Sequence, residues 1–474
     1  MSTGLSTDRA FEAPDQFLPP SILWGEELKA SFKLSWPLVI AQLAQMALYT
    51  TDVIMMGWLG PKSLAAGTLA TTLMSPFLLF GIGLITAVAP MMAQAIGALD
   101  FKSVRRTTRQ GFWAAVLVAT ILVALIWNAE FIFLILGQTP ENASKAQGYI
   151  RFAVWSFFPA FLFLVLRCLL SSHGKTSVVL YITIAGIVVN ALGNYALMFG
   201  NWGFPKLELP GAGISTTFVN TIMFVLILAY ILMHRRYKRY AILVRLWKPD
   251  WSRFREIFRI GLPIGFTLTA ETGLFTAAAI LMGWLGTNEL AAHAVALQCA
   301  ALAFMVPLGI SQAATIRVGL AYGKKNLDGI RKAGWVSIAM GTGFMVFTCL
   351  AFWLIPNTLV AFFLDPALPE NEVTLGLAVS YLAVAALFQL VDGCQVVASG
   401  ALRGLSDTKV PMFLAIFGYW VLGLPISYIG GFVLGGGGQG IWLGLAAGLA
   451  FVAVVSVVRF TLRDRFGLTN YKSI

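Results

Sequence analysis

The chain has 474 residues, of which 58% are hydrophobic and 11% are charged. A soluble domain carries about 25% charged residues, so this sequence lacks the charge needed to cover a water-exposed surface. The composition indicates an integral membrane protein and excludes a water-soluble enzyme. The net charge of +12 must then be interpreted through membrane topology, because basic residues collect in cytoplasmic loops.

The first 34 residues are predicted to form an N-terminal tail. They lack the short apolar core of a signal peptide. A helix needs about 20 apolar residues to cross a bilayer, and the chain after this tail contains twelve such stretches. The predicted spans are 35–57, 69–93, 110–128, 148–170, 177–199, 212–233, 258–283, 295–317, 333–355, 375–400, 410–433 and 440–461.

The distribution of Lys and Arg predicts the orientation of these spans. Of the 33 basic residues, 26 fall in or at the edge of the two tails and the loops after even-numbered spans. The odd-numbered loops hold only Lys62, Lys145 and Lys206. Both termini are therefore predicted to be cytoplasmic, in a multi-pass protein of the inner membrane. The most basic loop, from Arg235 to Arg255, is interpreted as an anchor at the anionic leaflet, and no nucleic-acid partner is predicted.

An internal repeat divides the chain into two halves. The sequence Met-Gly-Trp-Leu-Gly at 56–60 recurs at 282–286, an offset of 226. The same offset pairs Pro37 with Pro263, Gly83 with Gly309 and Gly97 with Gly323. We expect an all-α fold with two six-helix lobes related by a pseudo-two-fold axis along the membrane normal. The expected parts are an N-lobe (35–234), a basic linker (235–257), a C-lobe (258–462) and a cytoplasmic C-terminal tail (463–474).

Several short segments carry weaker expectations. The basic stretches at 102–106 and 328–332 are predicted to be short interfacial helices before the following spans. The four cysteines lack CxxC spacing and the three histidines are far apart, so neither a disulfide framework nor a zinc cluster is expected. No Walker motif is present, so ATP is not the expected energy source and no cofactor is predicted.

Three acidic residues, Asp52, Glu271 and Asp392, lie well inside apolar stretches. A carboxylate there costs roughly 2.5–3.5 kcal/mol on insertion scales, which favours a functional role over a structural one. The repeat places Gln45 opposite Glu271 and Ala278 opposite Asp52. The acids are therefore not repeated between the halves, and each half is expected to hold a distinct site.

In the N-lobe, Asp52 is predicted to lie at the same depth as Asn194 and Thr216, with Asn190 one helical turn below. One carboxylate with neutral oxygens suits Na⁺, and a titrating carboxyl suits H⁺ equally well. Hydrogen bonding between helices is the alternative explanation for the asparagine pair.

In the C-lobe, Phe275 follows Glu271 by one turn, and Phe388 precedes Asp392 by one turn. This arrangement could hold a cation through charge and cation–π attraction, although aromatic residues at this spacing also serve packing. Na⁺ could bind either at Asp52 with its three neutral neighbours or at the pair Glu271 and Asp392. Arg167 and Arg317 are predicted to snorkel toward the cytoplasmic interface.

The sequence resembles the multidrug and toxic compound extrusion (MATE) family, in its NorM branch. The resemblance covers nearly all of the chain after residue 30. The segments that carry it are 36–37, 51–57, 270–272, 316–319, 391–396 and 400–404. It implies a V-shaped cleft between the lobes and antibiotic resistance through export of cationic, amphipathic compounds in exchange for Na⁺ or H⁺.

The resemblance also implies roles for individual residues. It points to Asp52, Asn190, Asn194 and Thr216 as the N-lobe cation or proton site, and to Glu271 and Asp392 as the C-lobe coupling site. Some NorM members have Tyr where this chain has Phe388, so a phenolic ligand is lost there.

The expected function is secondary multidrug antiport by alternating access, not enzyme activity. The expected partners are small cationic substrates and membrane lipid, and the protein is expected to act as a monomer. The alternatives are a flippase for lipid-linked precursors, a membrane prenyltransferase and a structural or channel protein. A flippase needs a cleft rich in Arg and Lys, and a prenyltransferase needs paired aspartates for Mg²⁺; the spans contain neither pattern.

Overall fold

The computed structural model describes residues 23–238 and 240–470. Within these ranges the chain is helical and contains twelve segments long and apolar enough to cross a membrane. The first half comprises α1 (Trp24–Trp58), α2 (Pro61–Thr86), α3 (Val88–Gly97), α4 (Phe101–Ile126), α5 (Ala129–Ile135), α6 (Pro140–Ala153), α7 (Phe157–Ser172), α8 (Thr176–Phe199) and α9 (Glu208–Met233).

A basic linker with the short helix α10 (Arg235–Lys238) leads into the second half. That half comprises α11 (Trp251–Leu285), α12 (Thr287–Gly323), α13 (Leu327–Leu354), α14 (Pro356–Ala361), α15 (Glu372–Gly404), α16 (Lys409–Ile416), α17 (Leu424–Tyr428) and α18 (Gly437–Thr461). Between α16 and α18 the helix widens into π-helical turns at Phe417–Gly423 and Ile429–Val433, on either side of Pro425. Pro425 thus lies in an irregular part of this span.

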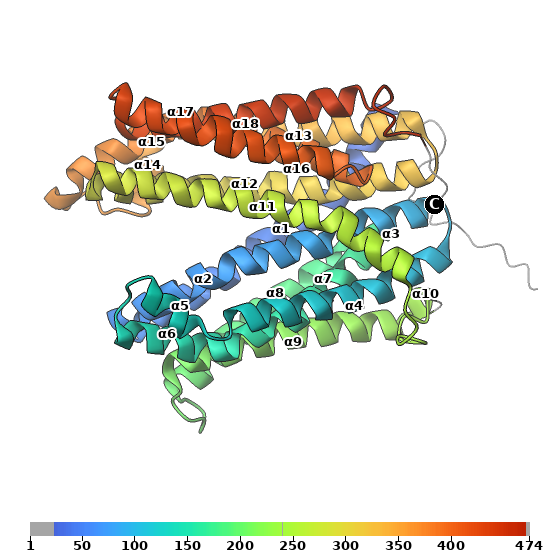
Figure 1. The fold of residues 1–474 in the computed structure, drawn as a ribbon, viewed down its shortest axis with the longest axis horizontal. Coiled ribbons are helices and arrows are strands. Elements are labelled where there is room, and N and C mark those ends of the chain that lie inside the picture. Colours follow the sequence, from blue (N-terminus) through green and yellow to red (C-terminus); the bar gives the residue numbers. More distant parts are fainter. Residues whose placement is uncertain (1–22, 239, 471–474) are drawn as a thin grey trace, which may run out of the picture.

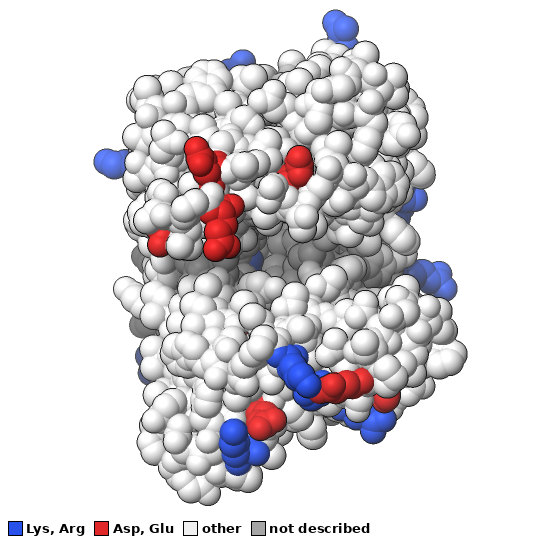
Figure 2. All heavy atoms as spheres, turned by 90° about the vertical axis from the view of Figure 1, so that its left-hand side faces the viewer, with Lys and Arg blue, Asp and Glu red and all other residues white. Residues whose placement is uncertain are grey.

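The two halves form two lobes (Figure 1). We call α1–α9 the N-lobe and α11–α18 the C-lobe. The lobes meet at the end that carries α3 and α10, which we call the basic end, and they separate toward the end that carries α5 and α14, the far end. Seen from the far end, the space-filling surface is hollowed between the lobes (Figure 2).

Contacts between the lobes reproduce the sequence repeat. A Cβ on Gly83 would lie 2.7 Å from the Cα of Gly265, and a Cβ on Gly309 would lie 2.7 Å from the Cα of Val39. Gly83 and Gly309 are partners at the offset of 226, and so are Val39 and Gly265. The same contact is therefore made twice with the lobes exchanged, as a pseudo-two-fold axis requires.

A second symmetric contact lies nearer the basic end. A Cβ on Gly97 would meet the Leu320 carbonyl oxygen at 2.2 Å, and one on Gly323 would meet the Gln94 carbonyl oxygen at 2.0 Å. Glycine at these positions lets the backbones of α3 and α12 touch directly. This close approach seals the lobes together at the basic end.

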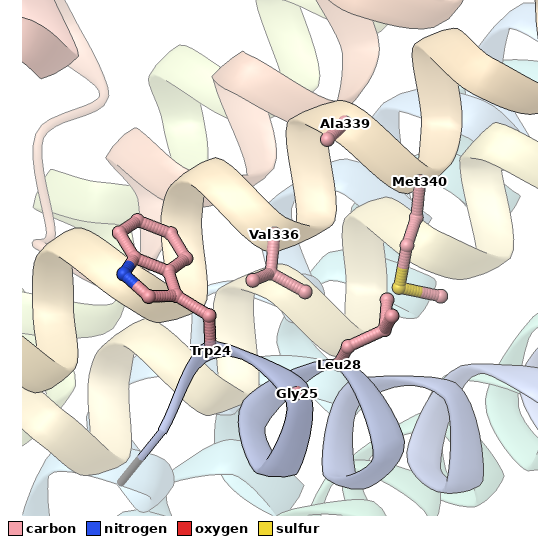
Figure 3. A pocket seen from close by; sticks show the side chains of 6 residues that line it. All are labelled: Trp24, Gly25, Leu28, Val336, Ala339 and Met340. Atoms are coloured by element: carbon pink, nitrogen blue, oxygen red, sulfur yellow. The ribbon is translucent and has the colours of Figure 1, made fainter. Parts of the chain in front are cut away.

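Helix α1 begins earlier than the predicted span that starts at residue 35. Its first turns pack on the C-lobe, where Trp24 and Leu28 of α1 face Val336 and Met340 of α13 around an apolar pocket of about 380 Å³ (Figure 3). The stretches at 102–106 and 328–332 are also not separate interfacial helices, because each continues without a break into α4 or α13. In all three cases polar residues occupy helical turns that a search for apolar stretches misses.

The prediction that Arg167 and Arg317 snorkel is wrong. Arg317 is buried, and its Nη2 and Nε lie 2.5 Å and 2.9 Å from the carboxylate oxygens of Glu27, itself fully buried. This ion pair joins the first turn of α1 to α12, across the two lobes. Arg167 is also buried, between the lobes, and is held by glutamine side chains.

Candidate functional site

The N-lobe site forms where α1, α8 and α9 meet. The Nδ2 atoms of Asn190 and Asn194 donate to the same carboxylate oxygen of Asp52, at 2.9 Å and 2.6 Å. The Thr216 hydroxyl lies 3.5 Å from the other oxygen and donates to the Ala212 carbonyl at 2.9 Å. The structure therefore brings together all four residues that the sequence placed at similar depth.

Local sequence explains this convergence. Asn190 and Asn194 are one turn apart and share a face of α8. A Cβ on Gly193 would lie 2.6 Å from the Ser215 hydroxyl, so glycine permits the close approach of α8 and α9. Tyr149 of α6 is buried beside Thr216 and Asp52. Sequence reasoning missed this tyrosine, although it is a polar aromatic residue inside a predicted span.

The oxygen atoms of the N-lobe site are suitable ligands for a small cation. The Oδ1 atoms of Asn190 and Asn194 are buried without a hydrogen-bond partner, beside a carboxylate. Buried amide oxygens without partners are costly, and a bound Na⁺ would be coordinated by this kind of oxygen set. A proton on Asp52 would also neutralise its charge, and the protonated carboxyl could donate a hydrogen bond to one of these amide oxygens.

The C-lobe site is built on α11 and α15. Glu271 lies close enough to act electrostatically on both Asp392 and Arg403. Oδ1 of Asp392 is buried and has no hydrogen-bond partner. The Phe275 and Phe388 rings pack edge to face, with centroids 6.0 Å apart. Phe388 is 1% exposed and also packs on Trp442, so in this conformation it serves packing.

Other buried polar atoms around α15 lack partners. They include the Gln389 Nε2, the Gln395 Oε1, both ring nitrogens of His293 and the indole nitrogen of Trp442. The Gln395 amide donates to the Tyr419 hydroxyl at 2.9 Å. Sequence reasoning missed these uncharged polar groups, although Gln389 and Gln395 lie one turn on either side of Asp392. The C-lobe interior is therefore more polar than its acidic residues alone suggest.

The described part of the chain holds no cluster of three or more His, Cys, Asp or Glu side chains that could bind a metal. The pocket between α1 and α13 lies apart from the acids, and its lining of Trp24, Gly25, Leu28, Val336, Ala339 and Met340 is uncharged.

The linker between the lobes is attached to the N-lobe. The Trp113 indole donates to the Leu246 carbonyl at 2.7 Å, and Arg106 pairs with Asp250, which caps α11. The Arg106 hydrogen bond lowers the pKa of Asp250 below its usual value. His173 lies 2.7 Å from the Tyr240 hydroxyl, and burial lowers its pKa to about 4. Both pKa shifts favour the ionisation states present near neutral pH.

Comparison with known proteins identifies the family. The MatE family model matches residues 37–196 and 263–429, one match in each lobe. A probable multidrug resistance protein NorM of Mesorhizobium japonicum is 43% identical, over 94% of this chain and 96% of its own length. The chain belongs to the MATE family, in its NorM branch. A second relative with the same description, from Brucella suis, is 45% identical over 92% of this chain and 93% of its own length.

Solved structures agree with this assignment. A eukaryotic MATE transporter matches with a TM-score of 0.84 at 18% identity, over 94% of this chain and 98% of its own. A multidrug resistance MATE family transporter in an outward-facing conformation also gives 0.84, at 21% identity, over 94% and 97% of the two chains. The expected twelve-helix, two-lobe fold and the expectation of a multi-pass transporter rather than an enzyme are confirmed.

Proposed function

We propose that this MATE transporter exports cationic, amphipathic compounds by antiport with Na⁺ or H⁺. The observation that carries the proposal is Asp52, whose carboxylate lies among three neutral polar side chains with two amide oxygens left without partners. A second pair of acids, Glu271 and Asp392, lies in the opposite lobe. Relatives described as multidrug resistance proteins support multidrug efflux as the outcome of transport.

The proposed cycle is alternating access. The basic end faces the cytoplasm, because basic residues are retained on that side of the inner membrane. In the described conformation the lobes touch at the basic end and separate at the far end, which corresponds to an outward-facing state. Rocking about the glycine contacts would close the far end and expose the same acids to the cytoplasm.

Coupling arises from competition for the intramembrane carboxylates. An organic cation entering from the cytoplasm neutralises Glu271 or Asp392 and is carried outward. Na⁺ or H⁺ entering from outside then binds the carboxylates and displaces it. Because an ion and a drug cation cannot both hold the same negative charge, the inward ion gradient drives export. No cofactor beyond the coupling ion takes part, and the transporter acts as a monomer.

The test is efflux of a fluorescent organic cation from proteoliposomes, with Na⁺ and pH gradients imposed separately. Acceleration by an inwardly directed gradient of either ion, relative to ion-equilibrated vesicles, is expected. The same rate with no gradient, with a Na⁺ gradient and with a pH gradient would overturn ion-coupled antiport.

A further inference from the structure

Arg167 is a buried charge without a counter-charge. The residue is 9% exposed, and it takes part in no ion pair with any of the residues that the structure describes. Its guanidinium donates to three amide oxygens instead. Nη2 lies 2.6 Å from Oε1 of Gln312 and 3.4 Å from Oε1 of Gln42, and Nη1 lies 3.4 Å from Oε1 of Gln45.

Burying a guanidinium requires partners for its hydrogen-bond donors and compensation of its charge, and these partners provide only the first. Glutamine oxygens satisfy hydrogen-bond donors, but they are neutral and leave the full positive charge uncompensated. An uncompensated charge inside a membrane protein is costly and usually faces a partner or a cavity. The cluster is not sealed on every side, because Gln45 is exposed.

The internal repeat shows which charge is missing. The pattern Leu-Arg-x-Leu at 166–169 recurs at 402–405, at an offset of 236, and it places Arg167 and Arg403 near the ends of the fourth and tenth spans. Arg403 has an acidic neighbour, since the Glu271 charge acts on it. At the offset of 226, the N-lobe counterpart of Glu271 is Gln45, the neutral side chain that Arg167 contacts. The N-lobe thus keeps the arginine and lacks the carboxylate.

We propose that Arg167, with Gln42, Gln45 and Gln312, forms a subsite for the carboxylate of zwitterionic amphipathic substrates. The substrate would supply the negative charge that Glu271 supplies in the C-lobe. A guanidinium suits this task because its planar donors match a carboxylate in two parallel hydrogen bonds. The proposal rests on the proposed function, in that the intramembrane acids would hold the cationic group of the same molecule.

The position of the subsite links it to both lobes. Arg167 belongs to α7 and Gln42 and Gln45 to α1, all in the N-lobe, whereas Gln312 belongs to α12 of the C-lobe. The shortest of the three contacts, at 2.6 Å, is the one that crosses between the lobes. A carboxylate bound to Arg167 would compete with Gln312, so its arrival would weaken a contact that joins the lobes.

The experiment measures equilibrium binding of rhodamine B, which carries a carboxylate, and of its methyl ester, which is only cationic. Purified full-length protein in nanodiscs is titrated without an ion gradient, with fluorescence anisotropy as the readout. In the wild type, rhodamine B should bind more tightly than the ester. Arg167→Gln should weaken rhodamine B at least about tenfold, the size expected for one charge-assisted contact, and should leave the ester within about twofold.

A second variant, Gln45→Glu, restores the missing carboxylate and keeps the arginine. It should remove the preference for rhodamine B as Arg167→Gln does, and it keeps the test meaningful if Arg167→Gln does not fold. Arg255→Gln, at an exposed arginine of α11, is the matched control and should change neither dye. Equal weakening of both dyes in Arg167→Gln and Gln45→Glu, or no change in either, would overturn the subsite. Because no gradient is involved, this result is independent of ion coupling.

Discussion

The two lobes share a scaffold and differ in their polar residues. The paired glycine contacts between lobes are made twice, through Gly83 and Gly309 and through Gly97 and Gly323. The acids are not repeated, because the N-lobe has Asp52 where the C-lobe has the fully buried Ala278. This difference indicates that both lobes kept the contacts that join them after duplication, whereas each lobe acquired its own polar residues.

The two acid sites also differ in the groups that surround their carboxylates. Asp52 accepts hydrogen bonds from neutral side chains of two other helices, an arrangement suited to a small ion. Glu271 and Asp392 lie near each other and near Arg403, with aromatic rings at hand, an arrangement suited to a larger organic cation. Both sites therefore offer negative charge to a cation, in different polar surroundings.

The largest expected effect concerns a contact that has no symmetric copy. The repeat counterpart of Arg317 is Met91, so the Glu27–Arg317 pair exists once. Arg317→Gln leaves Glu27 buried without its partner and should lower the free energy of unfolding by about 3–5 kcal/mol. Denaturant titration in detergent micelles measures this. The double variant with Glu27→Gln should recover most of the loss, and equal losses in the single and double variants would contradict the assignment.

The next effect tests the symmetric contacts. Gly97→Ala and Gly323→Ala each place a Cβ within 2.2 Å of a backbone oxygen of the other lobe, so each should cost about 1–3 kcal/mol. Cysteines introduced at the basic end should also become more accessible to a thiol reagent in both variants. Gly343→Ala has open space around its Cβ and serves as the control. Strongly unequal effects of the two substitutions would contradict the equivalence of the two contacts.

The buried His173, which contacts the linker, predicts that the free energy of unfolding depends on pH. The folded pKa of His173 is about 4, below its usual 6.5, because the ring is buried. Its contribution to stability is therefore complete above pH 6.5 and is lost as the pH falls from 6.5 toward 4. Between pH 7 and pH 5 the loss should be roughly 2 kcal/mol, measured by denaturant midpoints. His173→Phe should flatten this slope, and an unchanged slope in that variant would exclude His173 as its source.

The smallest effects separate the ligands within the N-lobe site. Asn194 donates to Asp52 at 2.6 Å and Thr216 at 3.5 Å. If the coupling ion is Na⁺, Asn194→Ala should weaken Na⁺ binding about tenfold, and Thr216→Val about two- to threefold. Isothermal titration with Na⁺ measures both. A larger effect from Thr216→Val would show that the ion binds in a different geometry.

Much of this account could be predicted from the sequence. The twelve spans follow from apolar length, and the two lobes follow from the repeat. The N-lobe site could be predicted because Asp52, Asn194 and Thr216 have matching depths, and because Asn190 and Asn194 share a helical face. These inferences need only the rise and the period of a helix.

Other features depend on contacts between distant segments. Arg317 resembles a snorkelling residue until the fold brings Glu27 against it, 290 positions earlier in the chain. The same reason applies to Arg167, whose partners lie on α1 and α12. The unpartnered groups of Gln389, Gln395 and His293 have no net charge near neutral pH, so a search for intramembrane charges does not find them.

The most direct test of carboxylate-coupled antiport compares Asp52→Asn, Asp392→Asn and the wild type in ion-driven efflux of a cationic dye from proteoliposomes. Removing either charge should abolish the acceleration by the ion gradient, with rates falling by about two orders of magnitude, while both variants remain folded. Wild-type rates in both variants under the same gradient would contradict the mechanism.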